Sequence, residues 1–222
     1  MNRQFGGVGR LHVITDTRVQ SRHGHARLAV LAAAGGADVV QLRHKGTLAK
    51  HTWLALAQQV MRALAATPAR LVINDRVDVA AAVGAGVHVG HGDPSPQLAR
   101  RRLGSRALLG ATAHSLQEAQ ALARGPIDYL GVGPVYATRS KDLDVAPLGL
   151  DGLAQIAGSV HRPVIAIGGI TVDRVAEVFA AGAAGIAVLS AVVCAGDPVG
   201  VTKALQRAIA AAQVNTAWAE GA

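Results

Sequence analysis

Cysteine and aromatic residues are scarce in this 222-residue chain, and both shortages exclude whole classes of protein. Cys194 is the only cysteine, so the chain cannot form an internal disulfide, a cysteine-rich zinc module or an iron–sulfur site. Aromatic residues make up 3% of the sequence, too few for the stacking platforms that bind single-stranded nucleic acids. The chain is therefore neither a disulfide scaffold nor a typical single-strand binder.

No secretory signal is visible in the sequence, and we expect no membrane span. Residues 1–7 contain no apolar core of a secretory signal, so we expect a cytoplasmic protein. The uncharged stretch at residues 178–196 has about the length of a membrane span but holds three glycines and many alanines. This stretch instead predicts a helix end, a turn, a buried strand and the start of another helix, and we expect no membrane contact.

Charged residues are few, and their signs are unbalanced. They make up 16% of the chain against 50% hydrophobic residues, which gives enough apolar surface for an ordered core. The net charge of +8 indicates an anionic partner: a nucleic acid, a membrane surface or a phosphorylated small molecule. The dense run of cations at residues 100–102 is typical of a solvated helix face. We therefore favour phosphorylated small molecules and expect no nucleic acid, while a homo-oligomer stays open.

Short β-branched apolar runs alternate with Ala/Leu-rich segments of helical spacing along the whole chain. The runs predict strands because they are continuously apolar, which is typical of parallel strands that helices cover on the outside. The eight predicted strands are residues 11–15, 38–43, 71–74, 86–89, 107–111, 128–133, 163–167 and 185–189. The eight predicted helices are residues 26–34, 48–66, 77–83, 96–102, 116–124, 150–157, 172–181 and 198–212.

Eight βα units in a chain of this length predict one closed (β/α)₈ TIM barrel, an α/β fold, in preference to an open doubly wound sheet. We expect a single domain over residues 1–222, with the barrel in residues 10–213. The tail at residues 214–222 is expected to lie outside the barrel and to lack order.

Polar residues collect where the predicted strands end, which is where βα loops build the active site of such a barrel. These segments are Thr15–Thr17, Gln41–Lys45, Asn74–Arg76, His91–Asp93, Thr112–Ser115, Thr138–Lys141, Gly168–Gly169 and Ser190. The predicted helices, by contrast, consist mostly of Ala, Leu and Val. The pattern predicts a polar pocket at one end of the barrel.

Each polar segment also has a structural interpretation. Gln41 and Arg43 share one face of a strand, so Arg43 either contacts an anion or forms a structural ion pair. Asn74 and Asp75 either cap the next helix or bind metal or substrate, and Asp93 before a proline can be a turn residue. His114, taken alone, is more typical of a structural histidine.

The remaining segments favour phosphate. Residues 138–141 place hydroxyls and cations in one loop, and Gly168 and Gly169 let backbone N–H groups approach an anion. Asp75 and Asp93 end neighbouring predicted strands beside basic residues, which suits Mg²⁺ holding a diphosphate. A zinc site is disfavoured, because the spacing of His88 and His91 on or near a strand does not bring them together.

The motifs resemble those of the family of thiamine-phosphate synthases and thiazole tautomerases. The resemblance covers nearly the whole chain and rests on Val40–Lys45, Ile73–Arg76, Gly86–Asp93, Thr112–Ser115, Gly131–Lys141, Pro147–Gly149 and Ala166–Ile170. Three positions depart from the synthase pattern: His91 replaces Gln, Thr112 replaces Ser and Ala137 replaces Pro.

The resemblance implies an Mg²⁺-dependent enzyme that joins a hydroxymethylpyrimidine diphosphate to a thiazole phosphate and releases pyrophosphate by a dissociative mechanism. Asp75 and Asp93 would bind the metal. The candidate catalytic residues are Arg43, Thr112, His114 and Lys141. The candidate substrate-binding residues are Gln41, Arg43, Lys45, Asn74, Thr112, Thr138, Ser140, Lys141, Gly168, Gly169, Leu189 and Ser190.

Two other functions stay open. A thiazole tautomerase would use His114 as a general acid or base and would need neither metal nor diphosphate. A non-catalytic sensor of phosphorylated ligands would keep the glycines and Ser190 without needing both carboxylates. The presence of Asp75 and Asp93 together with Arg43, Lys45 and Lys141 favours the synthase.

Overall fold

Eight parallel strands close into a barrel in the computed structural model, which describes residues 7–138 and 146–219. Each strand pairs with its neighbours in chain order, and β8 pairs with β1. The strands are β1 (Leu11–Thr15), β2 (Val39–Leu42), β3 (Arg70–Asn74), β4 (Gly86–Val89), β5 (Leu109–Ala113), β6 (Tyr129–Val132), β7 (Val164–Ile167) and β8 (Gly185–Val188). The predicted (β/α)₈ barrel is confirmed.

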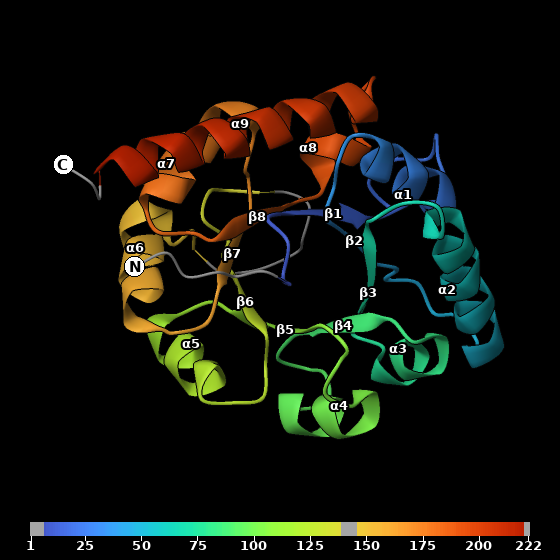
Figure 1. The fold of residues 1–222 in the computed structure, drawn as a ribbon. Helices are drawn as coiled ribbons and strands as arrows, with labels where there is room; N and C mark the ends of the chain where they lie inside the picture. The colour runs from blue at the N-terminus through green and yellow to red at the C-terminus, as the bar shows by residue number, and fades with distance from the viewer. Residues whose placement is uncertain (1–6, 139–145, 220–222) are drawn as a thin grey trace.

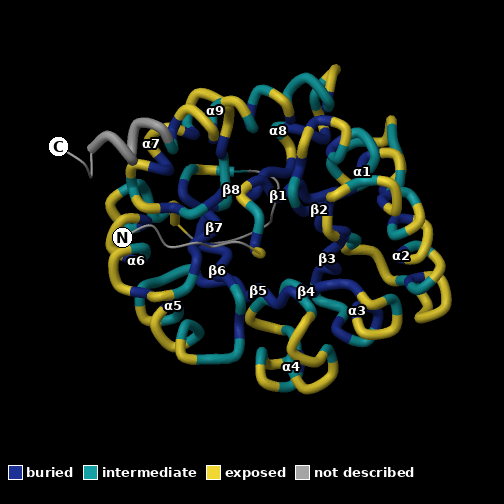
Figure 2. The backbone as a smooth tube through the Cα atoms, in the orientation of Figure 1, coloured by how far each residue is buried: buried dark blue, intermediate teal, exposed yellow. Residues whose placement is uncertain are grey.

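Helices surround the strands on the outside (Figure 1). They are α1 (His25–Ala34), α2 (Lys50–Leu64), α3 (Val77–Val83), α4 (Pro96–Leu103), α5 (Leu116–Ala123), α6 (Gly149–Ser159), the 3₁₀ turn η1 (Val172–Arg174), α7 (Val175–Ala180), α8 (Ser190–Val193) and α9 (Pro198–Ala219). Figure 2 shows the strands buried at the centre and the exposed residues on the outer helices. Nearly every strand residue is buried, as the continuous apolar runs predict.

Several elements differ from the prediction, and α9 runs to Ala219, past the predicted helix end at residue 212 and into the tail that was expected to lack order. β5 begins at Leu109 instead of residue 107, because Asp128 Oδ2 accepts a 2.7 Å hydrogen bond from Leu109 N and Arg100 Nη1 holds the Ala107 carbonyl at 2.8 Å. The predicted helix 172–181 is split into η1 and α7. The helix start predicted after the buried strand within residues 178–196 is the short helix α8, which ends at Val193 and is separate from α9.

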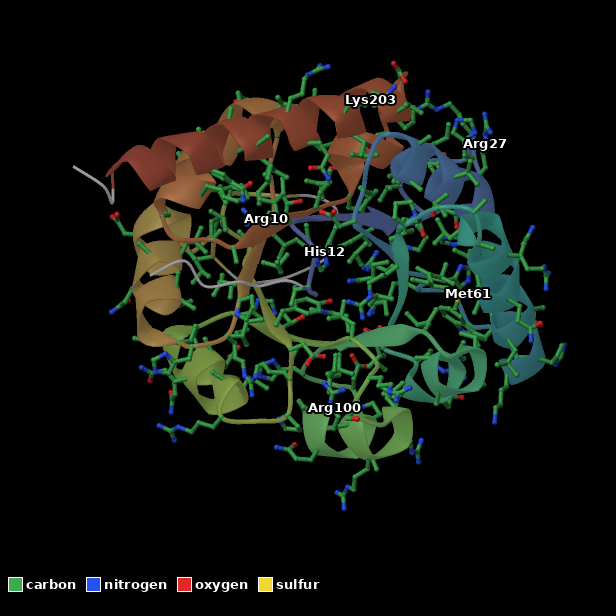
Figure 3. All side chains as sticks on the ribbon, in the orientation of Figure 1. Arg10, His12, Arg27, Met61, Arg100 and Lys203 are labelled. Carbon is green, nitrogen blue, oxygen red and sulfur yellow. The ribbon has the colours of Figure 1, made fainter. Side chains whose placement is uncertain are left out.

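The core consists of two hydrophobic clusters. The larger lies between the strands and the surrounding helices, and the smaller includes barrel residues such as Ile14, Val72, Tyr129 and Ile165. Val8 belongs to the smaller cluster, and its carbonyl accepts a 3.0 Å hydrogen bond from His12 Nε2. Figure 3 shows His12 near the centre of the ring of strands. Within residues 7–138 and 146–219, no helix is long and apolar enough to span a bilayer.

Candidate active site

A cavity of about 740 Å³ is lined by residues at or beyond the carboxyl ends of the strands, together with residues inside the barrel. The lining contains every predicted site residue that the structure describes: Gln41, Arg43, Lys45, Asn74, Asp75, Asp93, Thr112, His114, Thr138, Gly168, Gly169, Leu189 and Ser190. Ser140 and Lys141 lie outside the described residues. The fold therefore gathers these segments around one space, while the role of each residue stays a prediction.

Arg43 follows β2 and forms a buried ion pair with Asp16, which follows β1. The other Asp16 oxygen, Oδ1, accepts a 2.8 Å hydrogen bond from Arg18 N. The structural ion pair is thus present, yet Arg43 also lines the cavity, and its buried Nε has no hydrogen-bond partner among the described residues. Sequence reasoning noted the polar end of β1 but did not identify Asp16 as the partner.

Asp75 follows β3 in an uncommon backbone conformation, with φ of 67°, the only positive φ of a non-glycine residue in the described chain. Such a backbone persists only when its surroundings hold it in place. Asn74 Nδ2 donates to Asp75 Oδ1, and Lys45 Nζ donates to Asp75 Oδ2. The N-cap residue of α3 is Arg76 and no side chain caps it, so the helix-capping interpretation of Asn74 and Asp75 is wrong.

Asp93 meets Asp75 although the two residues follow different strands. The Asp75 carboxyl group lies close enough to that of Asp93 to affect its pKa, and Asp93 Oδ2 accepts a 2.7 Å hydrogen bond from Gly90 N. Burial, opposed by the bond from Gly90, raises the pKa of Asp93, and the adjacent Asp75 carboxylate raises it further. Two neighbouring carboxyl groups repel each other when both are ionised, so this point in the cavity favours a cation.

His88 and Tyr129 form a polar floor that sequence reasoning missed. Tyr129 Oη lies 3.0 Å from His88 Nδ1, and Thr112 Oγ1 lies 2.8 Å from His88 Nε2. The prediction placed Thr112 in the loop after β5, whereas the structure places it within β5 itself. Successive side chains of a strand point to opposite faces of the sheet, so counting along β4 and β6 could have indicated that His88 and Tyr129 point into the barrel. Over the described residues, no group of three His, Cys, Asp or Glu side chains is placed to hold a metal ion.

His114 lies at the rim, after β5. Its Nδ1 bonds to the Gly133 carbonyl, so Nδ1 carries the hydrogen, because a carbonyl oxygen can only accept. Its ring stacks on the ring of His91 with centroids 6.2 Å apart. His91 Nε2 in turn lies 3.7 Å from Glu118 Oε1. His114 is therefore positioned by the adjacent loops, as its structural interpretation predicts, and also lines the cavity.

Gly168 and Gly169 form the opposite wall of the cavity, after β7. Their φ angles are 103° and 65°, a region that suits glycine. A side chain at Gly169 would approach the Ala137 carbonyl to 2.8 Å, so the loop after β7 packs directly on the loop after β6. Arg174 also lines this wall, and sequence reasoning missed it because it falls inside a predicted helix.

Comparisons with known proteins identify the family of this chain. The family described as thiamine monophosphate synthase matches residues 11–192. The thiamine-phosphate synthase of Chloroflexus aurantiacus is 45% identical over 92% of this chain and 94% of that protein. The corresponding protein of Salinibacter ruber is 45% identical over 91% of this chain and 89% of that protein.

A solved structure shows the same similarity. The thiamine phosphate pyrophosphorylase from Pyrococcus furiosus superposes with a TM-score of 0.82 at 35% identity, covering 91% of this chain and 96% of that one. The motifs that carried the resemblance all lie within the matched residues 11–192. The chain therefore belongs to the thiamine monophosphate synthase family.

Proposed function

We propose that this protein is a thiamine-phosphate synthase, which joins 4-amino-5-hydroxymethyl-2-methylpyrimidine diphosphate to a thiazole phosphate and releases pyrophosphate. The observation that carries the proposal is that the neighbouring carboxyl groups of Asp75 and Asp93 line one cavity together with Lys45, and that this cavity is large enough for small ligands. Family membership supports the same activity, since the relatives named above carry that name.

Mg²⁺ fits the carboxyl groups of Asp75 and Asp93 and the residues around them. Asp75 and Asp93 offer hard oxygen ligands, and Asn74 and Lys45 hold the Asp75 carboxylate in place. A bound Mg²⁺ would neutralise the diphosphate and stabilise the negative charge that develops on the leaving oxygens. Because a cation lowers the repulsion between the two carboxylates, the raised pKa of Asp93 supports this assignment.

The basic residues on the same side would bind the diphosphate. Arg43 and Lys45 supply positive charge, and Gln41 and Asn74 supply amide donors from adjacent strands. In the dissociative mechanism that we propose, pyrophosphate leaves before the thiazole nitrogen attacks the pyrimidine methylene carbon. Fixed cations lower the barrier of that departure, so the chain needs no nucleophile of its own. Lys141 is assigned to the same group by the family resemblance and lies outside the described residues.

The thiazole phosphate would occupy the opposite side of the cavity. Thr138, Gly168, Gly169 and Ser190 offer hydroxyl and backbone donors there, and Leu189 lines the adjoining surface. The two substrates then meet near Thr112, whose hydroxyl lies next to His88 on the cavity floor. Such an arrangement places the thiazole nitrogen beside the carbon from which pyrophosphate departs.

The test is an assay of the purified protein with both substrates, with and without Mg²⁺, scored by formation of thiamine phosphate. We expect product only when both substrates and Mg²⁺ are present. Isomerisation of a thiazole carboxylate phosphate without Mg²⁺, in the absence of coupling, would instead support a tautomerase. Binding of both substrates without any turnover would support a non-catalytic sensor, and either result would overturn the proposal.

A further inference from the structure

Three arginine or lysine side chains line the cavity among the described residues: Arg43, Lys45 and Arg174. Arg43 pairs with Asp16, and Lys45 pairs with Asp75. Arg174 forms no ion pair with any carboxylate in the described part of the chain. The Asp173 carboxylate interacts with Arg174 electrostatically without forming an ion pair. Arg174 is thus the lining cation that no described carboxylate contacts directly, and the function proposed above gives it no role.

The guanidinium of Arg174 is held in place by two different loops. Its Nη1 donates a 2.6 Å hydrogen bond to the Gly169 carbonyl, in the loop after β7. Its central carbon lies 4.3 Å from the centre of the Tyr136 ring, in the loop after β6. Tyr136 is itself fixed, because its hydroxyl donates to Glu177 Oε1 on α7. The side chain is therefore ordered before any ligand binds, which lowers the entropy cost of binding.

The position of Arg174 also indicates the kind of ligand that its side chain would bind. Most of its donors remain after the bond to Gly169, and a guanidinium presents them as a planar fork that matches phosphate oxygens. The polar residues that share this wall, Thr138, Thr171 and Ser190, are uncharged. Arg43 and Lys45 follow β2, so among the described lining residues only Arg174 brings a full positive charge to the wall formed after β6 and β7.

We infer that Arg174 binds the phosphate group of the thiazole substrate and makes the enzyme prefer the phosphorylated thiazole over the free alcohol. This inference rests on the proposed function and identifies a specificity-determining residue for it. The chemistry on the wall supports it, since hydroxyl and backbone donors orient a phosphate while Arg174 neutralises its charge.

The experiment compares Arg174→Gln with the wild type, using the thiazole phosphate and the corresponding thiazole alcohol. We expect the KM for the phosphate to rise about 10- to 100-fold, the range for losing charge-assisted hydrogen bonds. The KM for the alcohol and that for the pyrimidine diphosphate should change less than about twofold. Arg174→Lys should recover part of the preference, because it keeps the charge without the fork. Arg27→Gln, on the outer face of α1 (Figure 3), is the matched control and should behave as wild type.

An equal loss with phosphate and alcohol would show that Arg174 only supports the loops, and would overturn the inference. Calorimetric binding of the thiazole phosphate alone gives a second readout that needs no turnover. If the wild type makes no thiamine phosphate but binds the thiazole phosphate through Arg174, only the proposed function fails. If Arg174→Gln does not fold, Arg174→Lys carries the test, and unchanged discrimination in that variant contradicts the inference.

Discussion

Arg43 and Asp16, 27 residues apart in the chain, form an ion pair with side chains that are only 7% and 1% exposed. A buried charge is costly unless a partner compensates it. The carboxylate of Asp16 therefore lets Arg43 stay charged at the edge of the cavity. The pair links the loops after β1 and β2, so both stability and the diphosphate binding that we propose for Arg43 would depend on this contact.

Replacing Asp16 by Asn should destabilise the protein, because it leaves the Arg43 guanidinium buried without a countercharge. We expect the free energy of unfolding to fall by about 3 kcal/mol, the lower end for breaking a buried pair on one side. Urea unfolding at pH 7 measures this loss. A decrease below about 1 kcal/mol would show that Arg43 finds compensation elsewhere.

The double variant Asp16→Asn/Arg43→Met separates stability from function. Removing both charges should restore stability to within about 1 kcal/mol of wild type, because no uncompensated charge is then left buried. Pyrophosphate release should remain low, because the cation beside the diphosphate is gone. Recovery of both properties would contradict the role proposed for Arg43.

Replacing Asp75 or Asp93 by Ala should abolish Mg²⁺-dependent pyrophosphate release. Each carboxylate supplies one of the two protein ligands that we propose for the metal, so either loss leaves it poorly held. We expect kcat/KM to fall by at least about 100-fold, the upper range for disturbing groups that merely support a metal site. Mg²⁺ titration of activity gives the apparent affinity.

Asp78→Ala is the matched control for these variants. Asp78 forms a surface ion pair with Arg76, with both nitrogen–oxygen contacts at 2.8 Å, and it does not line the cavity. We expect its activity and Mg²⁺ dependence to match wild type, with a stability change below about 1 kcal/mol. Near-normal turnover in both Asp75→Ala and Asp93→Ala would contradict the proposal that these two residues bind Mg²⁺.

His114→Ala should leave the coupling reaction largely intact. General acid or base catalysis contributes roughly 100- to 10,000-fold, so a decrease in kcat below about tenfold would exclude that role. We expect such a small decrease, because His114 bonds to the Gly133 carbonyl and stacks on His91 at the rim. A loss confined to proton exchange on the thiazole would instead favour the tautomerase activity.

The strands could be predicted because both faces of each strand are covered. Burial on both sides requires a continuous apolar run, and such runs stand out between glycines and polar loops. β5 was placed two residues early because Leu108 extends the apolar run of Leu109. The contacts that fix its start come from Arg100 and Asp128, which a local pattern cannot reveal.

The same reasoning explains which site residues were found. Asp75 and Asp93 stand out because they lie in polar segments that follow apolar runs, whereas His12 and Tyr129 lie within β1 and β6 and resemble core residues. Arg174 lies in an amphipathic stretch, where a basic residue predicts a solvated helix face. The pairing of Arg43 with Asp16 depends on strand neighbours in space, so the sequence left two interpretations open.

The free energy of unfolding should fall between pH 7 and pH 5 because of two buried histidines. Burial lowers the pKa of His12 from 6.5 to about 4, and burial together with the nearby His44 lowers the pKa of His25 to about 4. Above pH 6.5 both are neutral in the folded and unfolded states. As the pH falls from 6.5 toward 4, the unfolded chain binds protons that the folded protein does not, so stability is lost over this window.

Each histidine should contribute about 2 kcal/mol of loss between pH 7 and pH 5. His12→Gln retains a donor for the Val8 carbonyl but cannot titrate, so its stability should depend less steeply on pH than that of wild type. His25→Gln should remove a similar part of the pH dependence of stability, and the double variant should remove both parts. Urea unfolding at pH 7, 6 and 5 measures the slopes. Variants that follow the wild-type curve would show that these imidazoles are protonated inside the folded barrel.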